Sequence, residues 1–156
     1  MLRITILGLG TIKESYWRNA IAEFSKRLQA FVKLEIKELK DISFSDNDNP
    51  EVVKEKEAET IKKAIPKDSY IIALDEHGKE FDSISFSQKI ESIKLEHSHI
   101  TFIIGGTLGL HSTIFENIDL KLSLSKSTIT HQMVRVILLE QIYRASMISA
   151  GKPYHH

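Results

Sequence analysis

The last third of the chain concentrates the residues that can do chemistry. His131 and Arg135 are four positions apart, a spacing that places both on one face of a helix. Arg144 lies on roughly the opposite face, where Glu140 stands at the same spacing and can pair with it. An imidazole can accept a proton near neutral pH, and a guanidinium binds anions through its planar fork. These residues are candidates for proton transfer and anion binding; the structural alternatives are a capping role for His131 and an ion pair for Arg144.

Two loops in the same region have the composition of a ligand site. Gly105 and Gly106 end one apolar run, and the Ser/Thr-rich segment 124–129 follows another. Ligands of open α/β sheets bind where strands end, so we expect a small-molecule site at these loops. A tight turn that needs positive φ is the alternative explanation for the glycine pair. The earlier Gly8-Leu9-Gly10 turn is no dinucleotide fingerprint, because Lys13 stands where the third glycine belongs.

Strands and helices that could position these residues alternate along the chain. Apolar runs predict buried strands, and one alternating apolar and charged segment predicts a half-exposed strand. The predicted strands are 3–9, 32–39 (half-exposed), 69–74, 100–104 and 120–124. The predicted helices are 13–31, 50–65, 83–95, 111–117 and 131–149, with loops at 41–49 and 75–79. This order predicts an α/β fold, a mostly parallel sheet with helices on both faces.

Length and composition bound the class of protein. A chain of 156 residues, 42% hydrophobic and 27% charged, predicts one globular domain over residues 1–156 without an appended RNA-binding domain. No apolar run is long enough for a membrane span and no signal peptide is visible, so we expect a cytoplasmic protein. The absence of cysteine excludes disulfides and thiolate zinc sites. His97 and His99 lack further ligands nearby in the sequence, so we expect no metal.

Charge and hydrophobicity point to two kinds of partner. The net charge is zero, which argues against an indiscriminate nucleic-acid binder. Residues 121–156 nevertheless carry five Lys or Arg against the single Glu140, which favours an anionic partner at the predicted ligand loops; a solvated surface is the alternative. The last predicted helix is apolar on nearly every side. Such a helix is buried in a large core or an oligomer interface, and in a chain this small we expect a symmetric dimer.

The motifs resemble one family along the whole chain. They are HQMVRV at 131–136, YRA at 143–145 and PYH at 153–155, with the first strand and the segments 54–57 and 71–79 in matching order. This pattern is similar to the RlmH family, ribosomal large-subunit pseudouridine methyltransferases of the SPOUT group. Thr130 departs from it, since the family usually has a proline before the histidine. The resemblance implies a SPOUT α/β-knot, a deep trefoil knot that periodicity and composition could not have indicated.

The same resemblance implies a reaction and a set of site residues. It implies that a homodimer uses S-adenosyl-L-methionine to methylate N3 of pseudouridine 1915 in 23S rRNA of the assembled ribosome. The tail would reach into the partner subunit's site, with His155 or His131 accepting the N3 proton and Arg144 stabilising the imide anion. The catalytic candidates are therefore His155, Tyr154, Arg144 and His131. The cofactor-binding candidates are Leu74, Gly105, Leu124, Ser125, Lys126, Ser127, Thr128 and Ile129.

Two other functions are compatible with the coarse order of elements. A flavodoxin-like nucleotide-binding module would share the order, but it needs a phosphate loop after the first strand, and residues 8–13 supply a poor one. A noncatalytic ribosome-binding assembly factor would keep the basic end and the dimer without needing cofactor loops. Binding of S-adenosylmethionine, of FMN or of neither distinguishes the three.

Overall fold

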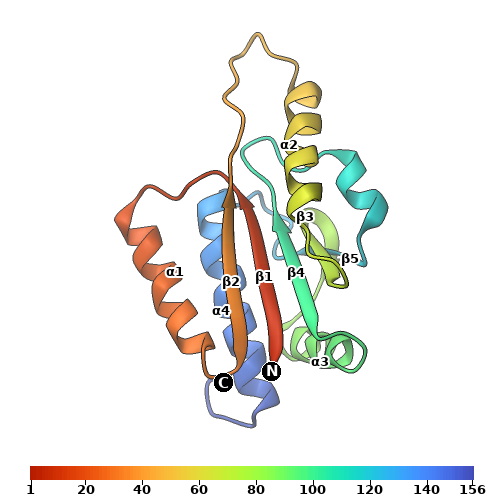
Figure 1. Ribbon diagram of the computed structural model, residues 1–156. Helices are drawn as coiled ribbons and strands as arrows, with labels where there is room; N and C mark the ends of the chain where they lie inside the picture. The colour runs from red at the N-terminus through yellow and green to blue at the C-terminus, as the bar shows by residue number, and fades with distance from the viewer.

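A five-stranded, all-parallel sheet forms the centre of the molecule (Figure 1), as the computed structural model of residues 1–156 shows. The strand order is β2-β1-β4-β3-β5. The strands are β1 (Leu2–Leu9), β2 (Val32–Leu39), β3 (Tyr70–Glu80), β4 (His99–Ile104) and β5 (Leu120–Ser123). The helices are α1 (Ser15–Leu28), α2 (Pro50–Ala64), α3 (Ser83–Lys94), the 3₁₀ helix η1 (Ser112–Asn117) and α4 (His131–Ser149). The predicted α/β class and parallel sheet are confirmed.

Helices cover both faces of the sheet, and each face has its own core. On one face α4 packs between α1 and α3, and the larger cluster includes Ile4, Phe102 and Leu138, each fully buried. On the other face α2 and η1 cover a smaller cluster around Ala58, Ile61 and Ile103. β1 and β4 are central, which explains their apolar sequences. β2 is an edge strand, which explains its alternating pattern.

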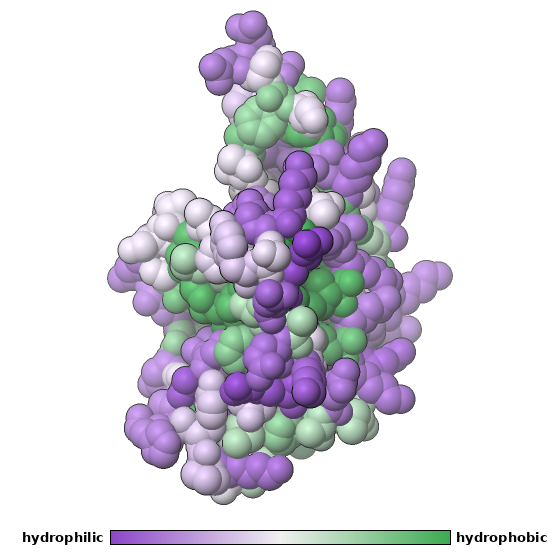
Figure 2. Space-filling view, turned by 90° about the vertical axis from the view of Figure 1, so that its left-hand side faces the viewer, coloured by the Kyte–Doolittle hydropathy of each residue, from purple (hydrophilic) through white to green (hydrophobic).

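The strands all point the same way, so their C-terminal ends meet at one edge of the sheet. In Figure 1 this edge lies at the top, and both chain termini lie at the opposite end. The loop at 40–49 projects beyond the sheet at the same edge as the strand ends. Figure 2 shows the side on which α1 lies, where hydrophobic patches at mid-height interrupt a largely hydrophilic surface. None of the helices combines the length and the apolar character that a bilayer crossing requires.

The largest difference from the predicted elements is in β3. Residues 75–79 were expected to form a loop, yet β3 continues to Glu80, and its pairing with β5 shifts register between Leu74 and Lys79. Gly78 crosses β5 so closely that a Cβ there would lie 2.7 Å from the backbone of Lys121 and Leu122. A bulge permits this, because extra residues re-aim a strand without ending its pairing. At its ends α1 is shorter than predicted, Ser15–Leu28 rather than 13–31, whereas α4 has the predicted bounds.

Candidate functional site

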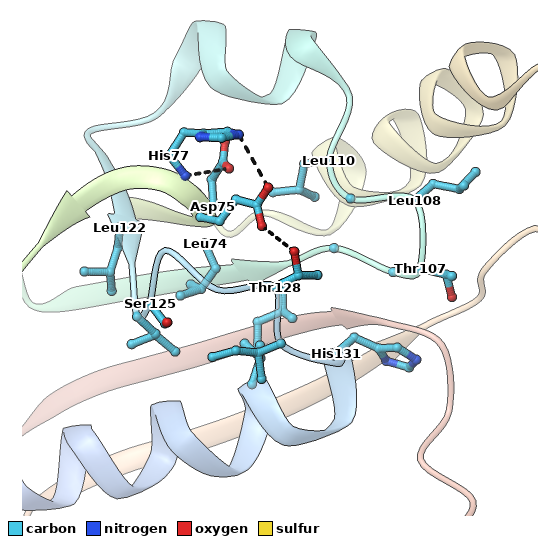
Figure 3. A pocket seen from close by; sticks show the side chains of 18 of the residues that line it. Leu74, Asp75, His77, Thr107, Leu108, Leu110, Leu122, Ser125, Thr128 and His131 are labelled. Atoms are coloured by element: carbon cyan, nitrogen blue, oxygen red, sulfur yellow. Dashed lines mark hydrogen bonds and ion pairs between the residues drawn. The ribbon is translucent and has the colours of Figure 1, made fainter.

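A cavity of about 500 Å³ lies at the C-terminal ends of β3, β4 and β5. Figure 3 shows its side chains converging from these strand ends and from the start of α4. The strand ends contribute Leu74, Asp75, Glu76, His77, Ile104 and Leu122. The loop after β4 contributes residues 105–110, and the loop after β5 contributes Leu124, Ser125, Ser127, Thr128 and Ile129. The predicted ligand site at these two loops is therefore a real cavity in the fold.

The glycine turn gives the cavity a wall of bare backbone. Gly109 N–H donates to the Gly106 carbonyl at 3.0 Å, and Gly109 has a φ of +79°. Positive φ is therefore needed at Gly109 and not at the Gly105–Gly106 pair. A Cβ on Gly105 would lie 2.9 Å from the Gly109 backbone. Gly105 is thus fixed both by the close turn and by its place in the cavity wall, so a bulky substitution there would distort the turn as well as the site.

The Ser/Thr-rich loop is held by short hydrogen bonds. Ser123 Oγ donates to the Ser125 carbonyl at 2.9 Å, and Ser127 N–H donates to Ser125 Oγ at 3.0 Å. Thr128 Oγ1 donates across the cavity mouth to Glu76 Oε2 at 2.9 Å. Lys126 is the one predicted cofactor residue that does not line the cavity. Its side chain is 87% exposed and lies 3.8 Å from a Glu80 oxygen.

Thr130, where the resembled family usually has proline, ends this loop and caps α4. Its side chain accepts from the Met133 N–H at 3.4 Å. Its φ of −60° and ψ of 145° are angles that a proline also adopts. Threonine therefore preserves the backbone conformation of the loop end and adds a hydroxyl acceptor to the helix start.

His131 lines the cavity from the first turn of α4. Its Nδ1 is buried without a hydrogen-bond partner. Burial and, second, the positive charge of Arg135 lower the pKa of His131 below its ordinary value. These effects favour the neutral imidazole, the form that can accept a proton, and also make the ring a weaker base. In Figure 3 it points toward the loop that follows β1, away from Thr128.

Arg135, on the same helix face as His131, is a structural residue. It is only 2% exposed and binds Glu38 Oε2 at 2.9 Å through Nη1. Its Nη2 donates to the carbonyls of Leu9 and Gly10 at 2.7 and 2.8 Å. Gly8 leaves the room it needs, since a Cβ there would lie 2.8 Å from the guanidinium carbon. Arg135 thus fastens the start of α4 to the end of β1 and is not available to bind RNA.

The other candidate catalytic residues form a second group, on the C-terminal half of α4. Arg144 Nε donates to Glu140 Oε1 at 3.0 Å, so the ion pair considered from the sequence is present. Tyr154 donates to the same oxygen at 3.2 Å, and its ring lies 4.7 Å from the Arg144 guanidinium carbon. His155 Nδ1 lies 3.4 Å from Arg144 Nη1. Burial and the Glu140 charge raise the pKa of Tyr154, which keeps the phenol protonated.

The two groups do not meet within one chain. Arg144 follows His131 by thirteen positions, which is about 20 Å along a helix. Arg144, Tyr154 and His155 do not line the cavity at the strand ends. His155 instead lines a neighbouring hollow of about 540 Å³, which shares Leu122 and Leu124 with that cavity.

Several lining residues were not selected from the sequence. Asp75, Glu76 and His77 were assigned to a loop without a role, and their position directly after a buried strand was the signal available. Burial alone would raise the pKa of Asp75, but the His77 N–H and Lys121 lower it. Lys54, from α2, and Phe115, from η1, also line the cavity. No local pattern places these two there.

Four of the five basic residues of the C-terminal segment are paired with carboxylates, three of them with carboxylates from other elements. Lys121 pairs with Asp75 at 3.0 Å, Arg135 with Glu38 and Arg144 with Glu140. Among the described ion pairs Lys126 also meets a carboxylate, that of Glu80. The five basic residues therefore do not form one free basic surface, and the anionic partner predicted from them gains no support from their count.

Comparison with known proteins decides the family. The profile described as "Predicted SPOUT methyltransferase" matches residues 2–155. This chain belongs to the SPOUT methyltransferase family. A protein of Methanococcus maripaludis named "Putative ribosomal RNA large subunit methyltransferase H" is 49% identical over 159 residues, covering 99% of both chains. Proteins named "Ribosomal RNA large subunit methyltransferase H" from Halothermothrix orenii and Bifidobacterium adolescentis are 44% and 46% identical, again over 99% of each chain.

Membership in the SPOUT family gives the cavity a chemical context. The cofactor-binding positions carried over from the family resemblance, except Lys126, all line it. They come from three strand ends that are far apart in the sequence and meet because the sheet order places β3 between β4 and β5. The cavity is therefore the candidate cofactor site of this SPOUT methyltransferase.

Proposed function

We propose that this protein transfers a methyl group from S-adenosyl-L-methionine to N3 of pseudouridine 1915 in 23S rRNA of the assembled ribosome. The observation that carries the proposal is the convergence of Leu74, Gly105 and the 124–129 loop on one cavity. The names of the relatives, which refer to the large ribosomal subunit, support the substrate class. Action on ribosomes is in keeping with a cytoplasmic protein.

The lining fits S-adenosylmethionine better than a nucleotide phosphate. The cofactor has an adenine, a ribose and a sulfonium but no phosphate, so it needs apolar contacts and backbone polar groups. Leu74, Leu110, Leu122 and Phe115 supply the apolar contacts, and the turn at Gly105 supplies accessible backbone. The only Lys or Arg in the lining is Lys54, whose Nζ is already bonded to Glu51 at 3.1 Å. When bound, the cofactor supplies an electrophilic methyl group.

The chain's own residues would then orient the base and remove its proton. N3 of the base is a weakly acidic imide nitrogen, and it must lose its proton in the reaction. His131 lines the cavity, and its neutral form, which burial favours, is the candidate acceptor of that proton; His155 is the second candidate. The Arg144 guanidinium can stabilise the imide anion through charge-assisted hydrogen bonds. Tyr154, stacked on Arg144, would hold it in place.

A composite site in a homodimer would bring these residues together. Within one chain Arg144 and the tail lie about 20 Å along α4 from His131. A second subunit that presents its own tail beside the cavity removes this separation. Apolar side chains are available for the contact, since Ile84 is 51% and Met133 42% exposed. Ile84 lines the hollow beside His155 together with Phe81 and Ile137, and this hollow would be part of the interface.

The flavodoxin-like alternative is disfavoured by the end of β1. A phosphate loop there needs free backbone N–H groups and open space. Instead the Arg135 guanidinium fills the space over Gly8, and Glu38 Oε2 accepts from the Ile12 N–H at 2.6 Å. The assembly-factor alternative leaves the cavity without a purpose. Calorimetry with S-adenosylmethionine and with FMN tests both alternatives, and we expect binding of the first ligand alone.

The decisive experiment uses ribosomes that lack the methyl group. Wild-type protein is incubated with labelled S-adenosylmethionine and with ribosomes from a strain that lacks its own enzyme. Nucleoside mass spectrometry and primer extension then identify and place the product. We expect one N3-methylpseudouridine per ribosome at position 1915, and none in ribosomes that carry uridine there. Methylation elsewhere, or none by a protein that binds the cofactor, would contradict the proposal.

A further inference from the structure

One carboxylate in the cavity lacks a Lys or Arg partner. Of the charged side chains in the lining, Lys54 is bonded to Glu51 and Asp75 is paired with Lys121 at 3.0 Å. Glu76 pairs only with His77, whose Nε2 lies 3.4 Å from Glu76 Oε1 and which is charged only if protonated. Glu76 is therefore the carboxylate of the cavity lining that has no Lys or Arg beside it.

The position of this carboxylate is fixed from two sides. Glu76 lies on the bulged extension of β3. Gly78, in the same extension, packs closely against the backbone of β5. Across the mouth, Thr128 Oγ1 donates to Glu76 Oε2 at 2.9 Å, a bond drawn as a dashed line in Figure 3. The side chain is 39% exposed, so it is partly shielded from solvent. A ligand in the cavity therefore meets a carboxylate held in place by the β3 extension and by the loop after β5.

We propose that the Glu76 carboxylate makes the cavity bind positively charged S-adenosylmethionine more tightly than S-adenosylhomocysteine, the product without net charge. This inference rests on the proposed function. S-Adenosylmethionine carries a sulfonium and an ammonium against one carboxylate, a net charge of +1. In the reaction its methyl carbon–sulfur bond breaks, the electron pair stays on sulfur, and the carbon bonds to N3 of the base. The remaining S-adenosylhomocysteine has no net charge, so attraction to Glu76 falls with transfer and the product leaves more easily.

Two substitutions separate the charge from the hydrogen bond. Glu76→Gln removes the negative charge and keeps an oxygen that can accept from Thr128. Thr128→Val removes the hydrogen bond and keeps the charge. Glu80→Gln is the matched control, because Glu80 lies on the same β3 extension and outside the cavity lining. Calorimetry at pH 8, where imidazoles are largely neutral, gives the affinity of each variant for S-adenosylmethionine and for S-adenosylhomocysteine.

We expect Glu76→Gln to weaken S-adenosylmethionine binding about tenfold, a typical size for one charge-assisted contact, and to leave S-adenosylhomocysteine binding within about twofold. Thr128→Val should change both affinities by the same factor, and Glu80→Gln should change neither. Added salt should reduce the preference of the wild-type protein for S-adenosylmethionine over S-adenosylhomocysteine, and it should have little effect on the ratio of the two affinities in Glu76→Gln. If Glu76→Gln leaves the ratio of the two affinities unchanged, Glu76 does not select the charge. That result would leave the proposed function standing, whereas a wild-type protein that binds neither ligand would overturn both.

Discussion

The two ends of α4 carry the same kinds of side chain in opposite environments. Near the start, Arg135 is buried and bonded to β1 and to Glu38. Near the end, the Arg144 side chain is 24% exposed and bonds Glu140 one turn away. A buried charge with fixed partners holds a fold together, and its removal leaves those partners unpaired. A partly exposed pair within one helix contributes less to stability.

The largest expected effect is on catalysis and comes from the surface end. Deleting Tyr154–His156 removes a ring that packs on Tyr143 and Arg144 but no residue of the cofactor cavity. We expect methyl transfer to fall by about 10²- to 10⁴-fold, the range for losing a positioned acid–base group. Single-turnover assays on ribosomes measure this loss. The control is S-adenosylmethionine affinity, which should stay within about twofold of wild type; an equal loss of affinity would mean that the tail belongs to the cofactor site.

Mixing two defective chains tests whether the tail acts on the neighbouring subunit. The tail-deleted chain keeps Arg144, and a full-length Arg144→Ala chain keeps the tail. In a heterodimer one intact site forms only if Tyr154 and His155 act on the other subunit's Arg144. Within one chain the tail contacts its own Arg144, so we expect no recovery of activity in a mixture that mass spectrometry shows to contain heterodimers. Recovery would mean that the tail acts on the neighbouring subunit's Arg144.

The next effect is on stability and comes from the buried end. Arg135→Met leaves the carbonyls of Leu9 and Gly10 without their donor and Glu38 without its cation. We expect a loss of about 3 kcal/mol in the free energy of unfolding, measured by urea denaturation. Arg144→Met, the matched change at the surface end, should cost about 1 kcal/mol or less. Equal losses for the two variants would remove the contrast between the helix ends.

Dimerisation should bring the end of α4 in one subunit close to the start of α4 in the other. A substitution at Ile84 tests this. Leu139, on the apolar surface of α4, is fully buried within one chain, so a charge there would disturb the fold itself. Ile84 is 51% exposed beside the hollow that His155 lines. We expect Ile84→Arg to give a folded monomer in sedimentation that binds S-adenosylmethionine and methylates ribosomes at least about tenfold more slowly, because desolvating an unpaired charge opposes association. A monomer with wild-type activity would exclude a composite site.

The smallest expected effect is a pH dependence at the buried end. The pKa of His131 is lowered by burial and by Arg135, so the unfolded chain binds a proton at this residue that the folded chain does not. The contribution of neutral His131 to the free energy of unfolding is therefore fully present above the pKa of histidine in the unfolded chain, near 6.5. It is lost as the pH falls below that value. In urea denaturation at pH 7.5 and 5.5, we expect His131→Asn to lose less stability than wild type on acidification. Identical losses would mean that His131 is equally protonated in both states.

Local patterns predicted much of the frame. The strand at 32–39 and the helix at 131–149 have the predicted bounds, because the alternation of the first and the apolar run of the second are local features of the sequence. The β3 extension could not be predicted in this way. Residues 75–79 are polar and contain Gly78, a composition typical of loops. Only the crossing over β5 pairs them, and β5 begins forty positions beyond Glu80.

The candidate site, too, was predicted only in part from the sequence. The glycine turn and the Ser/Thr-rich loop were recognisable because each follows an apolar strand, and the family resemblance named their cofactor role. The knot that this resemblance implies stays a prediction, as does the homodimer. Glu76 was not recognisable, because its importance depends on which neighbouring charges are already paired. Asp75 is paired with Lys121 from another strand, and Lys54 is paired with Glu51 on its own helix.

By itself the sequence determined the elements, the α/β class and the family, since hydrophobic period, caps and motif order are local properties of the chain. The tertiary structure decided which strand ends meet, because the order β2-β1-β4-β3-β5 differs from the order along the chain. It also decided the roles of the two arginines of α4. Both stand in motifs that resemble the family, but burial beside β1 commits Arg135 to the fold, whereas Arg144 stays partly exposed and bonds a carboxylate of its own helix.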